Sequence, residues 1–196
     1  MAKINFNFFA FVSRMRYINR WGLMRNTYTE SIQEHSHEVA ILAHALAVIR
    51  NVYFNGNVNE KKIAVMALYH DSDEIITGDL PTPIKYYNPE IKRAYKEIED
   101  IAKNKLLQML PDKLKPSYEE IIKPRPDDEE LWKIVKSADR LAAYIKCIEE
   151  EKAGNKEFKK AGTAILKTIH EINSPEVEYF MEHFLEGYKL TLDEME

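Results

Sequence analysis

The stretch DEELWKIVKSADRLAAYIKCIEEEK, residues 128–152, has the longest regular pattern in the chain. Apolar residues recur in it at spacings of three and four, which is the period of an α-helix with one buried face. The stripe comprises Leu131, Ile134, Val135, Ala138, Leu141, Ala142, Ile145 and Ile148. An acidic residue, Asp139, lies at the edge of this stripe. The stretch therefore predicts a long core helix that carries one carboxylate toward the interior.

Helical periodicity also dominates the rest of the chain, where glycine is scarce and alternating β-branched residues are nearly absent. Further helices are predicted over Phe6–Ile18, from Ser31 or Glu34 to Val52, from the N-cap Asn59 to Tyr69, and over Glu90–Leu110, Glu157–Glu171 and Pro175–Tyr188. Prolines and Gly78 predict an ordered loop over Ile75–Pro89 and a connector over residues 111–126. A length of 196 residues suits one core, so we expect an all-α fold of a single domain, residues 1–196.

The composition narrows the possible partners and the compartment. The chain has 28 Lys and Arg and 32 Asp and Glu, and it has no block of basic residues. We therefore expect no polymeric nucleic acid as partner. Cys147 is the only cysteine and cannot form an internal disulfide, which favours a reducing cytoplasm. No apolar run reaches the roughly 18 residues that span a bilayer, and the N-terminus lacks the pattern of a signal peptide. We therefore expect no contact with a membrane.

The dipeptide His70-Asp71 follows directly on the apolar stretch from Ile63 to Tyr69. A buried carboxylate is costly unless another group compensates its charge. A divalent cation does so, and it also binds a neutral imidazole nitrogen. For the dipeptide alone, the alternative is a hydrogen-bonded core histidine followed by a capping aspartate.

Two further residues favour the metal. His35 is in phase with the apolar positions of its predicted helix, so its ring should point into the same interior. Asp139 belongs to a residue type that is rarely buried without a partner. We therefore predict that His35, His70, Asp71 and Asp139 hold one divalent transition metal, with Co or Mn, or another such as Ni, Fe, Zn or Cu, suited to these donors.

Two acidic residues follow the dipeptide closely. Glu74 lies three residues beyond Asp71, and a continuing helical turn would place both carboxylates on one side. We expect Glu74 to transfer protons, and a solvated glutamate is the alternative. Asp73 is expected to lie in solvent.

Three residues of the predicted loops, Arg20, Trp21 and Asp79, are considered as contacts to a ligand. Arg20 has a planar donor fork that matches phosphate oxygens, although a surface arginine is the alternative. Trp21 on its own would more often be a core residue. Asp79 could accept a hydrogen bond from a ligand hydroxyl, or it could stabilise an Asx turn.

The order of the candidate ligands resembles the H…HD…D signature of the HD-domain metal phosphohydrolases. Further runs resemble the bacterial 5′-deoxynucleotidases of the YfbR type, and the resemblance covers nearly the whole chain. The runs are Asn19-Arg20-Trp21, Glu34-His35-Ser36, Tyr69-His70-Asp71, Glu74 and Thr77-Gly78-Asp79-Leu80-Pro81-Thr82-Pro83.

This resemblance implies a helical HD-domain fold with a buried metal site, and it implies roles for individual residues. Glu74 would be the general acid or base, and Arg20 would orient the phosphate. Trp21 would crowd the sugar and exclude a ribose 2′-hydroxyl, while Asp79 would bind the 3′-hydroxyl. The strip Pro124, Arg125, Pro126 and Asp127 matches a stretch that lines part of the nucleotide pocket. The resemblance also implies a homodimer.

The expected function is hydrolysis of deoxynucleoside 5′-monophosphates to deoxynucleosides and phosphate, selective against ribonucleotides and tolerant of the base. One alternative is a phosphohydrolase of the same fold for a deoxynucleoside triphosphate or a cyclic or pyrophosphorylated nucleotide. More phosphate groups would need more cations than the sequence offers beside Arg20. The other alternative is a non-catalytic nucleotide-binding helical module, which would not need to keep all four ligands and Glu74.

Overall fold

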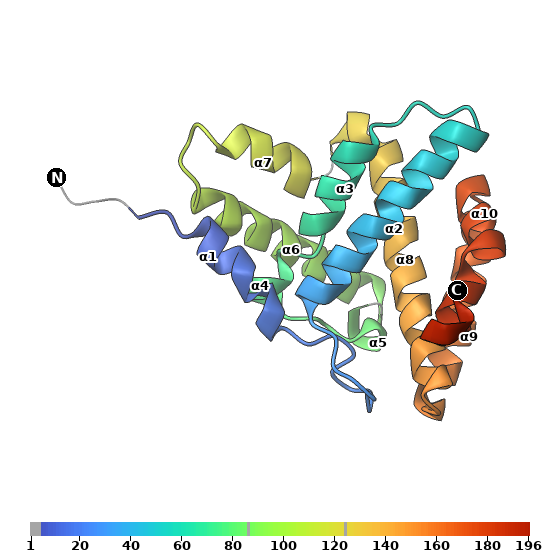
Figure 1. Cartoon of the computed structure of the whole chain (residues 1–196). Helices are drawn as coiled ribbons and strands as arrows, with labels where there is room; N and C mark the ends of the chain where they lie inside the picture. The colour runs from blue at the N-terminus through green and yellow to red at the C-terminus, as the bar shows by residue number, and fades with distance from the viewer. Residues whose placement is uncertain (1–4, 86, 124) are drawn as a thin grey trace.

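Every secondary-structure element of the described residues is a helix, which confirms the all-α fold class (Figure 1). The computed structural model describes residues 5–85, 87–123 and 125–196. The α-helices are α1 (Phe8–Val12), α2 (Ile32–Tyr53), α3 (Glu60–Tyr69), α4 (Glu74–Thr77), α5 (Thr82–Lys85), α6 (Pro89–Gln108), α7 (Lys115–Ile122), α8 (Glu129–Lys152), α9 (Lys159–Ile172) and α10 (Pro175–His183). None of these helices is both long and apolar enough to cross a bilayer.

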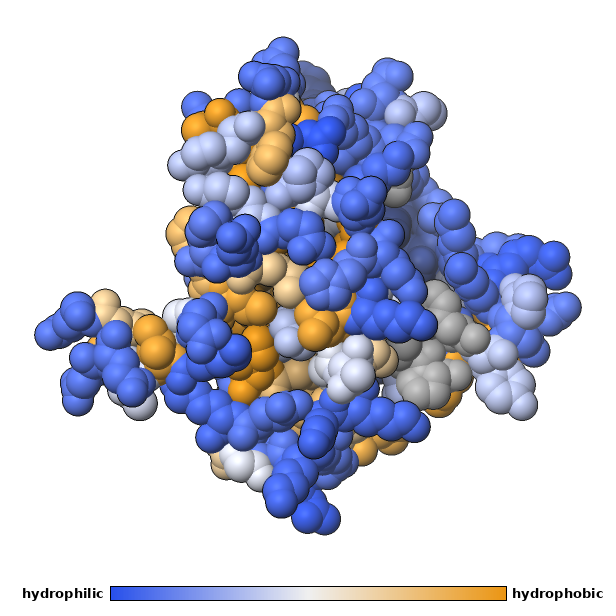
Figure 2. All heavy atoms as spheres, turned by 90° about the vertical axis from the view of Figure 1, so that its right-hand side faces the viewer, coloured by the Kyte–Doolittle hydropathy of each residue, from blue (hydrophilic) through white to orange (hydrophobic). Residues whose placement is uncertain are grey.

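Helix α8 lies in the main core and packs against α2, α3 and α9, whereas α10 packs against α2 (Figure 1). The middle of its predicted stripe is fully buried, which confirms the burial expected from the period. These residues are Ile134, Val135, Ala138, Leu141, Ala142 and Ile145. Toward solvent, the face that carries α10 is mostly hydrophilic, with hydrophobic side chains gathered between the polar ones (Figure 2). The core therefore forms around the helix that the sequence pattern singled out.

Side-chain caps fix the start of the two helices that lead to the candidate ligands. The Ser31 hydroxyl accepts the backbone N–H of Glu34, and the Glu34 carboxylate accepts the backbone N–H of Ser31 at 2.7 Å. This capping box satisfies two N–H groups that a helix start leaves free. Asn59 caps α3 by accepting the N–H of Lys62 at 2.9 Å. The predicted starts of both helices are confirmed.

Several segments differ from the sequence prediction. Over Pro175–Tyr188, α10 ends at His183 and a 3₁₀-helix follows over Leu185–Lys189. The N-terminal segment is not one helix over Phe6–Ile18, because α1 passes into a 3₁₀-helix over Ser13–Tyr17. The loop over Ile75–Pro89 contains the single turns α4 and α5, and the connector over residues 111–126 contains α7. Pro116 lies in the first turn of α7, where the missing N–H has no helical partner to lose. Proline therefore begins a helix at a place where it was expected to prevent one.

Candidate metal centre

The four candidate ligands lie together, although they come from distant parts of the chain. His35 belongs to the first turns of α2, His70 and Asp71 follow the end of α3, and Asp139 is in the middle of α8. Their nearest donor atoms all lie within 4.8 Å of one another. Nε2 of His70 is 3.0 Å from Oδ2 of Asp71, and Nε2 of His35 is 3.1 Å from Oδ1 of Asp139. Two imidazoles and two carboxylates thus converge on one point.

The orientation of the His70 ring fits a metal ligand. Its Nδ1 donates a hydrogen bond to the carbonyl oxygen of Ala67 at 2.7 Å. This bond leaves the lone pair of the neutral ring on Nε2, which is buried and has no hydrogen-bond partner among the described residues. A ring held through one nitrogen while the other faces acidic donors is the usual arrangement around a protein-bound metal. The cluster therefore fits a divalent cation.

The charges of the cluster support the same interpretation. Burial opposes protonation of His70, but the carboxylates of Asp71 and Asp139 overcome it and raise its pKa to about 9. Burial, together with the positive charge of Arg20, lowers the pKa of His35 to about 4. The carboxylates of Asp71 and Asp139 thus stabilise the positive charge of a proton on His70. A divalent cation can take the place of that proton, since metal ligands bind in their deprotonated form.

Glu74 is the first residue of α4 and is 7% exposed. Burial, followed by the negative charges of Asp71 and Asp79, raises its pKa to about 9. Its Oε2 is buried without a hydrogen-bond partner among the described residues. The solvated alternative is therefore wrong, and the raised pKa favours the protonated form of Glu74, which is the form that can donate a proton.

Asp73 was expected in solvent, and this prediction is wrong. Its side chain is buried, and one carboxylate oxygen is 3.8 Å from Nζ of Lys103. The reason is the short helix α4, which turns the chain against α6, where Lys103 is located. A periodicity argument could not find this contact, because the turn is too short to have a period.

Arg20 lies beside the candidate ligands and not on the open surface. Its Nε donates to Oε2 of the buried Glu30 at 3.1 Å, and its Nη1 is 3.5 Å from Oδ2 of Asp71. The side chain is 12% exposed, so the surface alternative is wrong. One edge of the guanidinium is fixed by Glu30, and the other faces the cluster. The sequence offered no signal for Glu30, which lies in an irregular segment.

Trp21 has a backbone conformation that is uncommon for a residue with a large side chain, with φ of 58°. Its N–H donates to Oδ2 of Asp79 at 3.2 Å, and its ring packs edge-on against Phe158, with centroids 5.3 Å apart. Such conformations persist where the surroundings hold them and are frequent at functional sites. Trp21 and Asp79, far apart in the chain, thus form one unit next to Arg20.

A buried ion pair in α8 holds the loop that carries Arg20 and Trp21. Lys146 and Glu150 are one turn apart, pair with each other, and are both at most 1% exposed. Nζ of Lys146 donates to the carbonyl oxygen of Tyr28 at 2.9 Å, and the Glu150 carboxylate accepts the N–H of Thr27 at 2.9 Å. This pair was not predicted from the sequence. The signal available was two opposite charges four residues apart, next to the apolar positions of the helix.

The described part of the strip predicted to line a nucleotide pocket is exposed and has no contact with the candidate ligands. Pro124 lies outside the described residues. Arg125, Pro126 and Asp127 are exposed, and Nη1 of Arg125 pairs with Glu120 at 3.4 Å. Within the described residues, no contact joins these three side chains to the candidate ligands.

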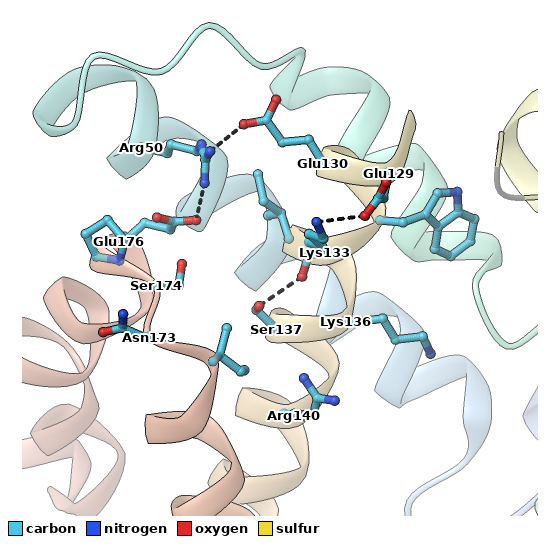
Figure 3. Close-up of a pocket in the computed structure, with 14 residues that line it drawn as sticks. Arg50, Glu129, Glu130, Lys133, Lys136, Ser137, Arg140, Asn173, Ser174 and Glu176 are labelled. Atoms are coloured by element: carbon cyan, nitrogen blue, oxygen red, sulfur yellow. Dashed lines mark hydrogen bonds and ion pairs between the residues drawn. The ribbon is translucent and has the colours of Figure 1, made fainter. Parts of the chain in front are cut away.

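A cavity of about 690 Å³ lies elsewhere, between the first half of α8 and the start of α10 (Figure 3). Arg50, Lys133, Arg140 and Glu176 are among the residues that line it, and Arg50 pairs with Glu176 across it. None of the four candidate ligands lines this cavity. The chemistry of the donors, and not the size of a hollow, identifies the site.

Comparison with known proteins agrees with this geometry. Residues 7–188 match the family described as 5′-deoxynucleotidase YfbR-like. The chain is 53% identical over 189 residues to 5′-deoxynucleotidase yfbR of Photorhabdus temperata, covering 96% of each chain. It is 51% identical over 192 residues to a 5′-deoxynucleotidase of Erwinia tasmaniensis, covering 98% of this chain and 97% of that protein.

Solved structures show the same fold. An HD-domain phosphohydrolase from Listeria innocua superposes with a TM-score of 0.81 at 25% identity, over 93% of this chain and 88% of that one. The HD phosphohydrolase DatZ of cyanophage S-2L, solved with dA and one catalytic Zn²⁺ ion, superposes with a TM-score of 0.64 at 19% identity, over 91% of this chain and 96% of that one.

Proposed function

The chain belongs to the family of YfbR-like 5′-deoxynucleotidases, and we propose on this basis that it hydrolyses deoxynucleoside 5′-monophosphates to deoxynucleosides and inorganic phosphate. The convergence of His35, His70, Asp71 and Asp139 within 4.8 Å is the observation that carries this proposal. The two near-full-length relatives are both named 5′-deoxynucleotidase, which favours a deoxynucleoside 5′-monophosphate over the other nucleotides considered.

The four residues would hold one divalent cation. When bound, such a cation supplies a water of lowered pKa and neutralises charge on the phosphoryl group. We propose cobalt or manganese, with nickel, iron, zinc or copper as further candidates, because mixed imidazole and carboxylate donors accept all of these ions and availability decides among them.

Arg20 and Glu74 would act on the phosphate ester itself. Nη1 of Arg20 is 3.5 Å from Oδ2 of Asp71, so once Asp71 binds the cation the guanidinium can hold phosphate oxygens in a fixed orientation. As the bond between phosphorus and the 5′ oxygen breaks, the protonated Glu74 donates its proton to that oxygen. The buried position of Glu74 keeps this proton in place at neutral pH.

Trp21 and Asp79 would select the sugar. Oδ2 of Asp79 is used by the Trp21 N–H, so Oδ1 remains to accept a hydrogen bond from a 3′-hydroxyl. The indole ring, fixed against Phe158, would act as a wall against a 2′-hydroxyl. A fixed wall is needed because an apolar pocket alone discriminates weakly against an added hydroxyl.

We propose a cytoplasmic homodimer that accepts all common bases and does not bind polymeric nucleic acid. The formal net charge of -4 supports the absence of a nucleic-acid partner. For the strip Pro124, Arg125, Pro126 and Asp127, a contact with the base would require the exposed residues Arg125, Pro126 and Asp127 to approach the substrate.

The test is phosphate release from dAMP and AMP by protein treated with EDTA and then reloaded with Co²⁺ or Mn²⁺. We expect release from dAMP only after reloading, and much slower release from AMP. Equal turnover of both nucleotides would contradict the role of Trp21, and no turnover of any nucleotide would contradict the enzymatic function.

A further inference from the structure

Lys136 lies in α8 one helical turn before Asp139 and was not singled out by the sequence. Its Nζ is 3.4 Å from Oδ2 of Asp139, whose other oxygen, Oδ1, faces Nε2 of His35. One carboxylate therefore separates this ammonium group from the point on which the candidate ligands converge. We propose that Lys136 is a second phosphate-binding cation of the site, which deepens the function proposed above and rests on it.

Its exposure leaves Lys136 free to reach a ligand. The side chain is 52% exposed, whereas that of Arg20 is 12% exposed and fixed by Glu30. It extends from α8 away from the side of the cavity where Asn173 and Ser174 lie (Figure 3). A half-exposed lysine beside partly buried carboxylates can move its ammonium group by a few bond rotations.

The charge balance of the site explains why a second cation is needed. A phosphate monoester carries about 1.5 to 2 negative charges at pH 7. The two charges of a divalent cation are matched by those of Asp71 and Asp139. The charge of Arg20 is already shared with the buried Glu30 at 3.1 Å. Lys136 thus supplies a positive charge that the surrounding carboxylates do not cancel once Asp139 binds the cation.

The same helix offers a matched control. Lys133 lies one turn before Lys136, is 73% exposed, and pairs with Glu129 at 2.8 Å (Figure 3). It has the same charge and a similar surface position but no contact with a candidate ligand. Lys133→Gln therefore reports the general effect of removing one positive charge from this face of α8.

The experiment measures binding and turnover separately on the full chain. Calorimetric titration of inorganic phosphate into the Mn²⁺-loaded protein gives its Kd, and steady-state kinetics with dAMP give KM and kcat. The variants are Lys136→Gln, Lys136→Arg and Lys133→Gln. We expect Lys136→Gln to raise the Kd of phosphate and the KM of dAMP about tenfold, or about 1.4 kcal/mol. Lys136→Arg should stay within about threefold of the wild type, and Lys133→Gln should have little effect.

A second titration, with Mn²⁺ alone, separates phosphate binding from a role in orienting Asp139. Loss of a nearby positive charge should leave the affinity for Mn²⁺ unchanged or increase it. An unchanged phosphate Kd in Lys136→Gln would overturn the proposal. So would a weaker affinity for Mn²⁺ that accounts for the whole loss of phosphate binding. The phosphate Kd decides this point even if the wild type hydrolyses no nucleotide, which would overturn the proposed function instead.

Discussion

Raising the pH should tighten the binding of a divalent cation to this chain about tenfold per pH unit between about pH 6.5 and 8. The reason is the proton on His70. Burial opposes this proton, but Asp71 and Asp139 raise the pKa of the imidazole to about 9, well above its usual value of about 6.5. Nε2 must lose the proton before it can bind a metal.

The size of the effect follows from the fraction of His70 whose imidazole is unprotonated and can bind the metal. Two pH units below its pKa, only about 1% of an imidazole is unprotonated, and this fraction rises tenfold with each pH unit. Each unit therefore contributes about 1.4 kcal/mol to the apparent binding energy, until the dependence flattens near pH 9. His35 adds nothing over this range, because its pKa of about 4 leaves it neutral throughout.

The measurement is calorimetric titration of Mn²⁺ into EDTA-treated, dialysed protein, in pairs of buffers that differ in ionisation enthalpy. The difference in heat between two such buffers gives the number of protons released on binding. We expect about one proton released per ion at pH 7. Asp139→Asn is the informative variant, since it removes a carboxylate 3.9 Å from Nε2 of His70 and should lower both the affinity and its pH dependence. Metal binding with a flat pH profile and no proton release in the wild type would refute the reasoning.

Three further predictions concern catalysis, selectivity and stability. Glu74→Gln should lower kcat for dAMP by about 10²- to 10⁴-fold with little change in affinity for Mn²⁺, and wild-type kcat in this variant would exclude Glu74 as the acid. Trp21→Ala should reduce the preference for dAMP over AMP in kcat/KM about tenfold or more, and an unchanged ratio would show that another group selects the sugar. Lys146→Met should lower the free energy of unfolding by about 3 to 5 kcal/mol, because it leaves Glu150 buried without its partner. Calorimetric melting checks the last prediction, and the double variant Lys146→Met/Glu150→Leu should recover much of the loss.

The long helices could be predicted from the sequence because their buried faces repeat over many turns. In α8 the period is sustained over 24 residues, and α2 has both partners of its capping box in the sequence. The single turns α4 and α5 have no such repeat. Helix α7 was missed because proline was taken as a breaker, whereas Pro116 occupies the first turn, where it fits.

The candidate ligands could be predicted because burying an acidic or imidazole side chain in an apolar pattern requires compensation. His35, His70 and Asp139 all interrupt such patterns. The partners of Arg20 could not be found in this way, because Glu30 lies in an irregular segment whose direction is set by tertiary contacts. Lys136 has the helical phase to meet Asp139, but most lysines at this spacing form ordinary surface pairs.

Helix α8 connects the metal centre with the loop that faces it. Asp139 and Lys146 are seven residues apart on one rigid helix, a rise of about 10.5 Å. The first would bind the cation, and the second, with Glu150, fixes the backbone of Tyr28 and Thr27. Burying an ion pair is costly. Lys146 and Glu150 therefore contribute more by positioning the loop than by raising the free energy of unfolding. Since a helix transmits little relative movement between these points, the backbone of α8 itself sets the distance from Asp139 to the loop that carries Arg20 and Trp21.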